Sequence, residues 1–344
     1  MPVPKRRLLA IALITAVVFA LFLPRLLPRP APHYTVTDLG VLPGDTISWA
    51  TGINNRGEIV GFSATNYFDA GHIFCWINGR MTNLGPLDSP NIFHKPCIDD
   101  SGKINRKQSV SNELGVMSFG RTIPKRAVLY SDGKQIIVST PPGCVRAMLC
   151  GINTSGQVVG RCRRLTARSS LSKEAFVYDT NTRKIVFLAL PPGFSEAEAE
   201  AINDHNQITG WARQPGQSGL RAVLWNAGLP AAVPLLPGKD NSSGAAINNQ
   251  GEVVGSAWSE PNAAAQYVND HPLRWRLLVP IFERQWKNRA MIYRSGKAQD
   301  LNTLIPEDAD WTLEEAHGIN DHGQIVGYGL HHGQERAFLL TPTR

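Results

Sequence analysis

The segment Ile319-Asn320-Asp321-His322-Gly323-Gln324-Ile325-Val326-Gly327 carries the pattern that decides the fold of this chain. Its general form, Ile-Asn-x-x-Gly-x-Ile/Val-Val-Gly, occurs six times, including one variant and one worn copy in which Asp99 replaces the Asn. Such repetition indicates an array of supersecondary units rather than an ordinary single-core domain. The other copies are Ile53–Gly61, the worn copy from Ile98, Ile152–Gly160, the variant Ile202–Gly210 and Ile247–Gly255.

Each copy has the composition of a β-hairpin. Apolar β-branched residues flank a short polar segment in which Asn can bond its own backbone and Gly can take a positive φ. In the variant copy Asn206 stands in place of this Gly. Asn is the next-best residue in the left-handed region, so we expect a positive φ at Asn206 and a position selected for its backbone conformation.

Two further apolar runs follow each hairpin, which predicts about four strands per unit, the size of a β-propeller blade. The predicted third strands are Ile73–Ile77, Ala127–Tyr130, Ala175–Tyr178, Ala222–Trp225, Ala290–Tyr293 and Ala337–Leu340. The predicted fourth strands lie in Met81–Leu87, Gln135–Gly143, Ile185–Gly193, Ala232–Gly238 and Ala298–Pro306. Single helical turns are expected only at Ser195–Ala201 and Leu313–His317.

The chain ends predict how the array closes. Ala337–Leu340 supplies a third strand with no fourth after it, whereas Tyr34–Gly44 resembles a fourth strand with no first three. Joined, they complete one blade and hide the sheet edges that an open array would expose. We therefore predict an all-β fold, a six-bladed β-propeller over residues 33–344 closed by the N-terminal strand. An open β-solenoid is the alternative.

Residues 1–32 form a separate segment. Lys5-Arg6-Arg7 precedes the uncharged, mostly apolar stretch Leu8–Leu23, and a proline-rich spacer follows. This arrangement is typical of an export signal. We predict an uncleaved signal anchor in the inner membrane, formed by a helix over residues 8–23, with a cleaved signal peptide as the alternative. The domain would then be periplasmic or extracellular.

The basic charge of the chain comes largely from this segment. The net charge is +7, and residues 1–32 hold five Lys/Arg and no acid, which leaves +2 for the rest. The high pI therefore gives little support to nucleic-acid binding.

Five scattered cysteines do not make a disulfide-dense scaffold. Cys150 and Cys162 flank one hairpin and are the disulfide that we predict, while Cys144 is a competing partner for either. The cysteines could instead pair as Cys75–Cys97 or stay as buried thiols. The spacing of Cys and His does not suggest zinc.

The last repeat resembles the bacterial HAF-repeat proteins in its stretches Leu301–Pro306, Trp311–Leu313, Ala316–Gly327 and Arg336–Leu340. The family takes its name from a His-Ala-Phe tripeptide, for which this chain has Arg336-Ala337-Phe338. The resemblance covers nearly all of residues 34–344 and implies an extracytoplasmic repeat protein. It implies no activity that could be assigned to particular residues.

The sequence contains no catalytic motif of the hydrolase, metalloprotease or phosphate-binding kind, and we predict no catalytic residue, metal site or cofactor. His205 and His322 occupy matching places inside the hairpin turns and are expected to fill turn positions. The acids Asp99, Asp100, Asp204 and Asp321 lie in the same turns and are expected to cap backbone groups. Calcium bound by these turns is the alternative.

The connection after the second strand varies most, and it is longest in the fifth unit, over Ser256–Arg289. Aromatic rings interleaved with arginine suit stacking on sugars or contact with a protein. A loop that buries its own aromatic side chains is the alternative. The candidate binding residues of this loop are Trp258, Tyr267, Arg274, Trp275, Arg276, Arg284 and Trp286.

Together these patterns predict a non-enzymatic binding module whose partner is a polysaccharide or an envelope protein, with the membrane as a further partner if the N-terminal segment is retained. The alternatives are a propeller-type hydrolase or lyase with a site in the central channel, and a purely structural envelope protein.

Overall fold

The computed structural model describes residues 33–66, 71–86, 96–102, 104–105, 126–131, 134–165, 171–260 and 288–343. Their regular structure is β-strand apart from two 3-10 turns, η1 (Leu301–Thr303) and η2 (Glu307–Ala309). The all-β prediction is therefore confirmed. The predicted signal or anchor at residues 8–23 lies outside the described residues. Among those described, no helix is long and apolar enough to cross a membrane.

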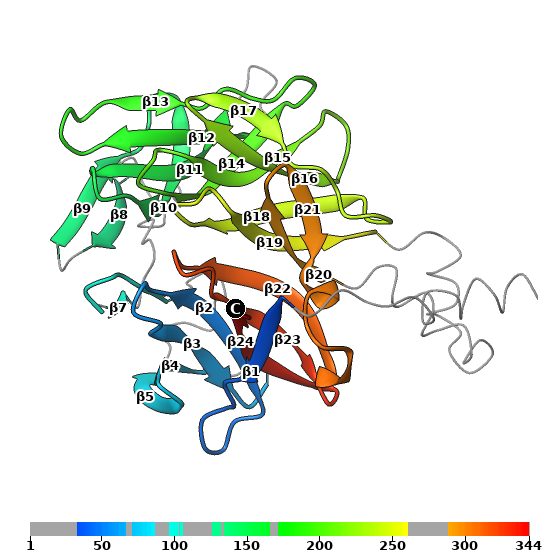
Figure 1. Cartoon of the computed structure of the whole chain (residues 1–344). Coiled ribbons are helices and arrows are strands. Elements are labelled where there is room, and N and C mark those ends of the chain that lie inside the picture. Colours follow the sequence, from blue (N-terminus) through cyan, green and yellow to red (C-terminus); the bar gives the residue numbers. More distant parts are fainter. Residues whose placement is uncertain are drawn as a thin grey trace, which may run out of the picture.

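Five four-stranded antiparallel sheets form the blades of a β-propeller, and in four of them the strands lie in chain order (Figure 1). The first comprises β2 (Ile47–Ile53), β3 (Ile59–Ala64), β4 (His72–Ile77) and β5 (Arg80–Pro86). The next three are β10 (Cys144–Ile152), β11 (Gln157–Leu165), β12 (Leu171–Asp179), β13 (Ile185–Phe187); β14 (Glu196–Ile202), β15 (Ile208–Arg213), β16 (Leu220–Asn226), β17 (Leu229–Ala232); and β18 (Asn241–Ile247), β19 (Val253–Trp258), β20 (Arg289–Arg294), β21 (Lys297–Asp300).

The fifth sheet joins the two ends of the chain. It contains β22 (Trp311–Ile319), β23 (Ile325–His331) and β24 (Gln334–Pro342), and its outer strand is β1 (Tyr34–Asp38). β1 pairs antiparallel with β24 from Tyr34 opposite Pro342 to Asp38 opposite Phe338. The prediction that the N-terminal strand completes the last blade is confirmed.

The unit with the worn copy is built differently. Its described residues form two two-stranded sheets, one of β6 (Cys97–Ile98) and β7 (Ile104–Asn105), the other of β8 (Arg126–Ser131) and β9 (Lys134–Ser139). The connection between β7 and β8, residues 106–125, lies outside the described residues.

The hydrophobic core lies between successive sheets, as in other face-to-face sheet packings. One cluster joins β11 and β12 to the β14–β17 sheet and contains Val159, Ala199 and the fully buried Trp225. Another joins β2–β4 to β23 and β24 through Ile59, Phe74 and their neighbours. Burial of a large side chain such as Val159, Ile59 or Phe74 contributes about 1.5–3 kcal/mol of hydrophobic free energy, so neighbouring sheets stabilise one another.

A β-bulge recurs on the first strand of each four-stranded sheet, two residues before the motif Ile. The pairing of the first two strands skips one residue there, and the skipped residue differs from sheet to sheet. The final Gly of the motif lies opposite the bulge, and at Gly255 a Cβ would collide with the carbonyl oxygen of Ser243. The skipped residues are Thr51, Cys150, Glu200, Ala245 and His317.

The two predicted helical turns are wrong, because both segments are first strands of blades. Glu196–Ile202 is β14 and Trp311–Ile319 is β22. In β14, acids alternate with buried alanines at period two, which is a strand pattern. The fourth strand of the β14–β17 sheet also begins earlier than predicted, at Leu229.

Candidate functional site

The motif Asn does two jobs in every turn where it is present. Its Oδ1 caps its own turn: Asn203 Oδ1 accepts hydrogen bonds from the backbone N–H groups of His205 (3.1 Å) and Gln207 (2.8 Å). The left-handed residue that closes the turn is Gly in most copies, and Asn206 has φ 62°, as predicted. His205 and His322 contribute backbone N–H groups to these turns, in agreement with their expected place as turn residues.

The Nδ2 atom of the same Asn reaches the next unit of the ring. Each of these Asn side chains is buried and donates to the backbone carbonyl of the equivalent residue in the following turn. We call this set of contacts the turn belt. Its links are Asn54 to Asp99 (3.0 Å), Asn153 to Asn203 (3.2 Å), Asn203 to Asn248 (2.9 Å), Asn248 to Asn320 (3.3 Å) and Asn320 to Asn54 (3.0 Å).

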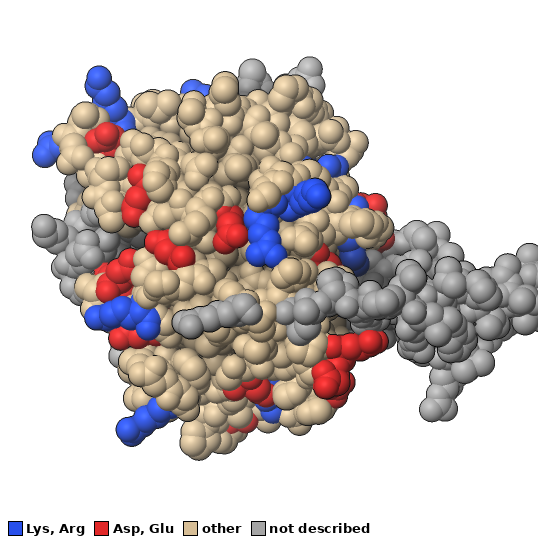
Figure 2. Space-filling view, in the orientation of Figure 1, with Lys and Arg blue, Asp and Glu red and all other residues tan. Residues whose placement is uncertain are grey.

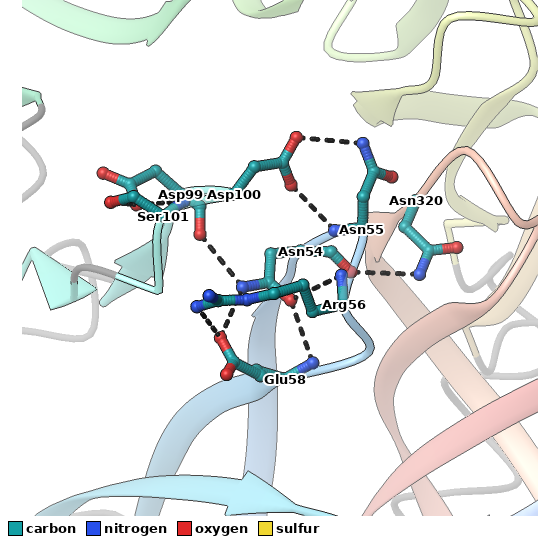
Figure 3. Close-up of polar contacts among 8 residues, drawn as sticks. All are labelled: Asn54, Asn55, Arg56, Glu58, Asp99, Asp100, Ser101 and Asn320. Atoms are coloured by element: carbon teal, nitrogen blue, oxygen red, sulfur yellow. Dashed lines mark hydrogen bonds and ion pairs between the residues drawn. The ribbon is translucent and has the colours of Figure 1, made fainter.

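A second row of contacts joins the residues that follow these asparagines. Asn55 donates its backbone N–H and its Nδ2 to the carboxylate of Asp100, at 2.8 and 2.9 Å (Figure 3). On its other side Asn55 Oδ1 accepts from the backbone N–H of Asp321 (2.8 Å). Asn249 bridges Asp204 and Asp321 in the same way. The six positions alternate between a donor residue and an acid, and in chain order they are Asn55, Asp100, Thr154, Asp204, Asn249 and Asp321.

These acids are held by N–H and O–H donors. Burial raises the pKa of Asp204, but the hydrogen bonds from Thr154 and Asn249 outweigh it, so its pKa is held below the usual range. Among the described residues, no three His, Cys, Asp or Glu side chains come together in a way that would hold a metal ion.

The residue after the turn Gly belongs to the belt, although the sequence pattern left it unspecified. It is always Glu or Gln in the clean and variant copies, and its side-chain oxygen accepts from Nδ2 of the motif Asn. The distance is 2.8 Å from Asn203 to Gln207 and 2.9 Å from Asn248 to Glu252. This restricted choice at one position was the signal that could have revealed the role of the side chain.

A different polar cluster lies midway along β22 (Trp311–Ile319). Glu315 Oε2 lies 3.0 Å from His317 Nε2, and Glu315 Oε1 accepts from Asn288 Nδ2 at 2.8 Å. The buried His317 is a skipped bulge residue, and its Nδ1 lies 3.0 Å from the carbonyl oxygen of Ala50 in the next sheet. Tyr328 faces Glu315 across the strand pair. We call these four residues, Asn288, Glu315, His317 and Tyr328, the Glu315 cluster.

Aromatic packing closes the Glu315 cluster on one side. The rings of Tyr328 and Trp49 stack with centroids 4.4 Å apart, and the Trp49 indole donates to Glu335 (3.0 Å). Burial, with the charges of Glu315 and Glu314 added, raises the pKa of Tyr328 well above its usual range. Burial also raises the pKa of Glu335, against the opposing hydrogen bond from Trp49. Tyr328 therefore stays a neutral phenol.

The predicted binding loop is only partly described. Trp258 is the last residue of β19 and so belongs to a strand rather than to the loop. Tyr267, Arg274, Trp275, Arg276, Arg284 and Trp286 lie outside the described residues. Asn288 and β20 follow directly after the loop, which ties its C-terminal end to the Glu315 cluster.

The cysteine pairing differs from the prediction. Cys162 forms its disulfide with Cys144, the competing partner, and not with Cys150. Cys150 is the skipped residue of the β10 bulge, which removes it from the pairing with β11. Burial, with the charge of Glu200 added, raises the pKa of the Cys150 thiol far above its usual range. Cys75 and Cys97, both described, are not joined by a disulfide.

Comparison with sequence families gives one match. A family model described as "Protein of unknown function (DUF3466)" matches residues 137–339, which is more than half of the chain. No curated protein matches the chain in sequence.

Several solved structures are similar to the chain at low identity. A Dyadobacter fermentans protein of unknown function is 10% identical over 90% of this chain and 98% of its own, with a TM-score of 0.48. The Pyrococcus horikoshii acylaminoacyl peptidase is 11% identical over 89% of this chain and 47% of its own, with a TM-score of 0.41. The Trypanosoma rangeli sialidase is 8% identical over 92% and 59%, with a TM-score of 0.43. This chain thus spans about half of the peptidase, and likeness at these values carries no argument about function.

The turn belt predicts opposite effects for two reciprocal substitutions. The side chain of Asp99 has no N–H group to donate to the next turn, so Asp99→Asn should add this donor and raise the free energy of unfolding by about 1 kcal/mol. Asn203→Asp should remove the donors to Asn248 and Gln207 and lower it by about 1–3 kcal/mol. Urea titrations of both variants would measure these changes, and an Asn203→Asp protein as stable as the wild type would contradict the role of the belt.

The lowered pKa of Asp204 predicts a pH-dependent effect. Stability that comes from a depressed carboxyl pKa is present above the unfolded value of about 3.9 and is lost as the pH falls through the folded value. Asp204→Asn also places its Nδ2 against Asn249 Nδ2, donor to donor. We therefore expect the variant to be less stable than the wild type at neutral pH, with the difference shrinking below about pH 4. Asp308→Asn, at an exposed acid, is the control, and a difference that stays constant with pH would refute the assignment.

Proposed function

Because the chain belongs to the family described as Protein of unknown function (DUF3466), we propose its function from its own residues: it is an exported six-bladed β-propeller that binds a polysaccharide or a protein of the cell envelope, without catalysing a reaction. The contact surface is the end of the blades opposite the turn belt. The resemblance to HAF-repeat proteins is part of this proposal.

Two contacts support a ring of six units. β1 joins β24 across nearly the whole length of the chain. In the turn belt, Asn320 of the last unit donates to Asn54 of the first, and Asn54 donates to Asp99 of the worn unit. The worn unit therefore takes its place in the belt, although its described strands form two small sheets.

Export is supported by the disulfide and by the N-terminal sequence. Disulfides persist in oxidising compartments such as the periplasm and the extracellular space, and Cys144–Cys162 is one. The basic residues Lys5-Arg6-Arg7 and the apolar stretch after them fit an anchor in the inner membrane. Lys/Arg and Asp/Glu side chains are interspersed on the face in Figure 2, so the proposal includes no nucleic-acid partner.

The difference between the two ends of the blades supports the choice of contact surface. At the turn belt, the motif Asn side chains are buried and use both their oxygen and their nitrogen within the protein. Away from the belt, the Glu315 side chain, midway along β22, is 28% exposed and accepts a hydrogen bond from Asn288, the residue directly after the long 261–287 connection. The proposal rests on this contact, because it fixes the C-terminal end of the most variable connection beside partly exposed polar groups of a rigid scaffold.

Replacing residues 261–287 with a short Gly/Ser linker between Glu260 and Asn288 tests the proposal. We expect the variant to keep its fold, by circular dichroism and thermal unfolding, and to lose co-sedimentation with envelope polysaccharide or pull-down of envelope proteins. The control replaces residues 67–70, in the connection between β3 and β4, which joins the second and third strands of another sheet. A folded 261–287 variant that binds as the wild type does would reject this connection as the contact.

A hydrolase or lyase is the second candidate, and the Glu315 cluster is the observation that favours it. A carboxylate within 3.0 Å of an imidazole, with a phenol beside it, can serve as a general acid or base. Against this, both ring nitrogens of His317 already have partners. If the chain is an enzyme, incubation with envelope polysaccharide should release soluble fragments detectable by mass spectrometry, and Glu315→Gln should slow the release at least about 100-fold. A polysaccharide left intact by the wild type would eliminate this candidate.

A further inference from the structure

The facing surfaces of two neighbouring sheets carry a concentration of charge that the turn belt does not explain. We call it the ionic junction. It lies between β11–β12 and β14–β15, which are adjacent in the ring (Figure 1). Its residues are Arg161, Arg163 and Lys173 on one side and Glu196, Glu198, Glu200, Trp211 and Arg213 on the other.

The inner level of the junction is internally neutralised. Arg161 Nη1 lies 2.9 Å from Glu198 Oε2 and 2.6 Å from Glu200 Oε1. Lys173 Nζ lies 3.2 Å from Glu198 Oε1 and 4.5 Å from the centroid of the Trp211 ring. Partly buried pairs of this geometry hold one another in place, so this level has little capacity left for a ligand.

The outer level has an excess of positive charge. Arg163 pairs directly with Lys173 in the register of β11 and β12, and like charges so placed repel. Arg163 is exposed and has no acid within ion-pair distance in the part of the chain that the structure describes. Arg161 meets Glu198, so the antiparallel courses of β11 and β14 place Arg163, two residues further on, at the level of Glu196.

Arg213 completes this outer level from the other sheet. It lies opposite Glu196 in the β14–β15 pair, and the closest contact of their side chains is 3.6 Å, longer than a hydrogen bond. Its Nε is buried and has no acceptor among the described residues. The Arg213 side chain as a whole is 33% exposed, and a planar carboxylate offers two oxygens to a guanidinium whose nearest acid lies beyond hydrogen-bond distance.

Apolar groups stand beside these cations. Leu165 and Leu171 lie directly opposite each other on the same face as Arg163 and Lys173, and their exposed fractions are 55% and 46%. An inorganic anion makes no favourable contact with apolar side chains, whereas a sugar ring has an apolar C–H face next to its substituents. The combination of cations and exposed leucines therefore favours a carboxylated sugar.

We propose that the outer level of the ionic junction, formed by Arg163 and Arg213 with Leu165 and Leu171, binds the uronate units of an acidic polysaccharide. This inference rests on the proposed binding function and names its ligand class. It places the uronate carboxylate between the two guanidinium groups and the sugar ring against the two leucines.

Calorimetric titration of the full chain with a galacturonic acid tetramer tests the proposal. We expect saturable binding that weakens with added salt, because the contact is between charges. Arg163→Gln and Arg213→Gln should each weaken binding about tenfold or more, the usual effect of losing a charge-assisted hydrogen bond. Arg183→Gln, at an exposed arginine in the turn at the other end of the same sheet, makes the same change in net charge and should leave the affinity unchanged.

The outcomes separate this proposal from the more general one. If the wild type binds maltotetraose or another neutral glycan but not the galacturonic acid tetramer, the uronate site is refuted while the binding function stands. Equal weakening by Arg183→Gln would show a non-specific charge effect and also refute the site. Inorganic phosphate that competes at the same concentration as the tetramer would show an anion site without sugar recognition and overturn the proposed ligand class.

Discussion

A buried asparagine amide bonded at both ends is the interaction on which the rest of this structure depends. Its oxygen fixes the hairpin turn of its own unit, and its nitrogen fixes the distance and angle to the next. Each link crosses from one sheet to another, so a turn cannot shift without breaking a hydrogen bond in its neighbour. Because buried amides left without partners are costly, the belt penalises any arrangement in which the units are not arranged in a ring.

The same constraint explains where the chain is free to change. At the turn-belt end, each unit except the worn one has Asn, a left-handed residue, and Glu or Gln in fixed places. Asn206 replaces Gly without loss of the turn because it also adopts a positive φ. The opposite end carries no such periodic bond among the residues that the structure describes, and the connections there differ in length from 166–170 to 261–287. Chemistry that varies between units, such as the Glu315 cluster and the ionic junction, extends from the bulge residues His317 and Glu200 towards that end.

Much of the fold could be predicted from the sequence, because the repeat reports local backbone conformation. The hairpins, the closing role of Tyr34–Asp38 and the positive φ of Asn206 follow from turn chemistry and from counting strands. The partner of each Asn nitrogen could not be read from one unit, since it lies in another. The restriction to Glu or Gln after the turn Gly was the one sign in the sequence that the side chain of the motif Asn has a further partner. The alternation of Glu with Ala in β14 indicates a strand. Because Glu and Ala also favour helices, the same residues led to the wrong prediction of a helical turn.

The β-bulges explain why some contacts of the candidate sites could not be predicted from the sequence. The skipped residue before the motif Ile, on the first strand of each four-stranded sheet, changes the pairing of the residues around it, and neither its presence nor its place can be seen in a pattern of apolar residues. At Cys150 it breaks the expected disulfide, and at His317 it lets a histidine contact both Glu315 and the neighbouring sheet. The repeated bulge is thus a scaffold feature with variable content: the same skip occurs in each four-stranded sheet, while the side chain at the skipped position is Thr, Cys, Glu, Ala or His. A ring that keeps its turns constant and varies this residue can alter the chemistry between blades without altering the fold.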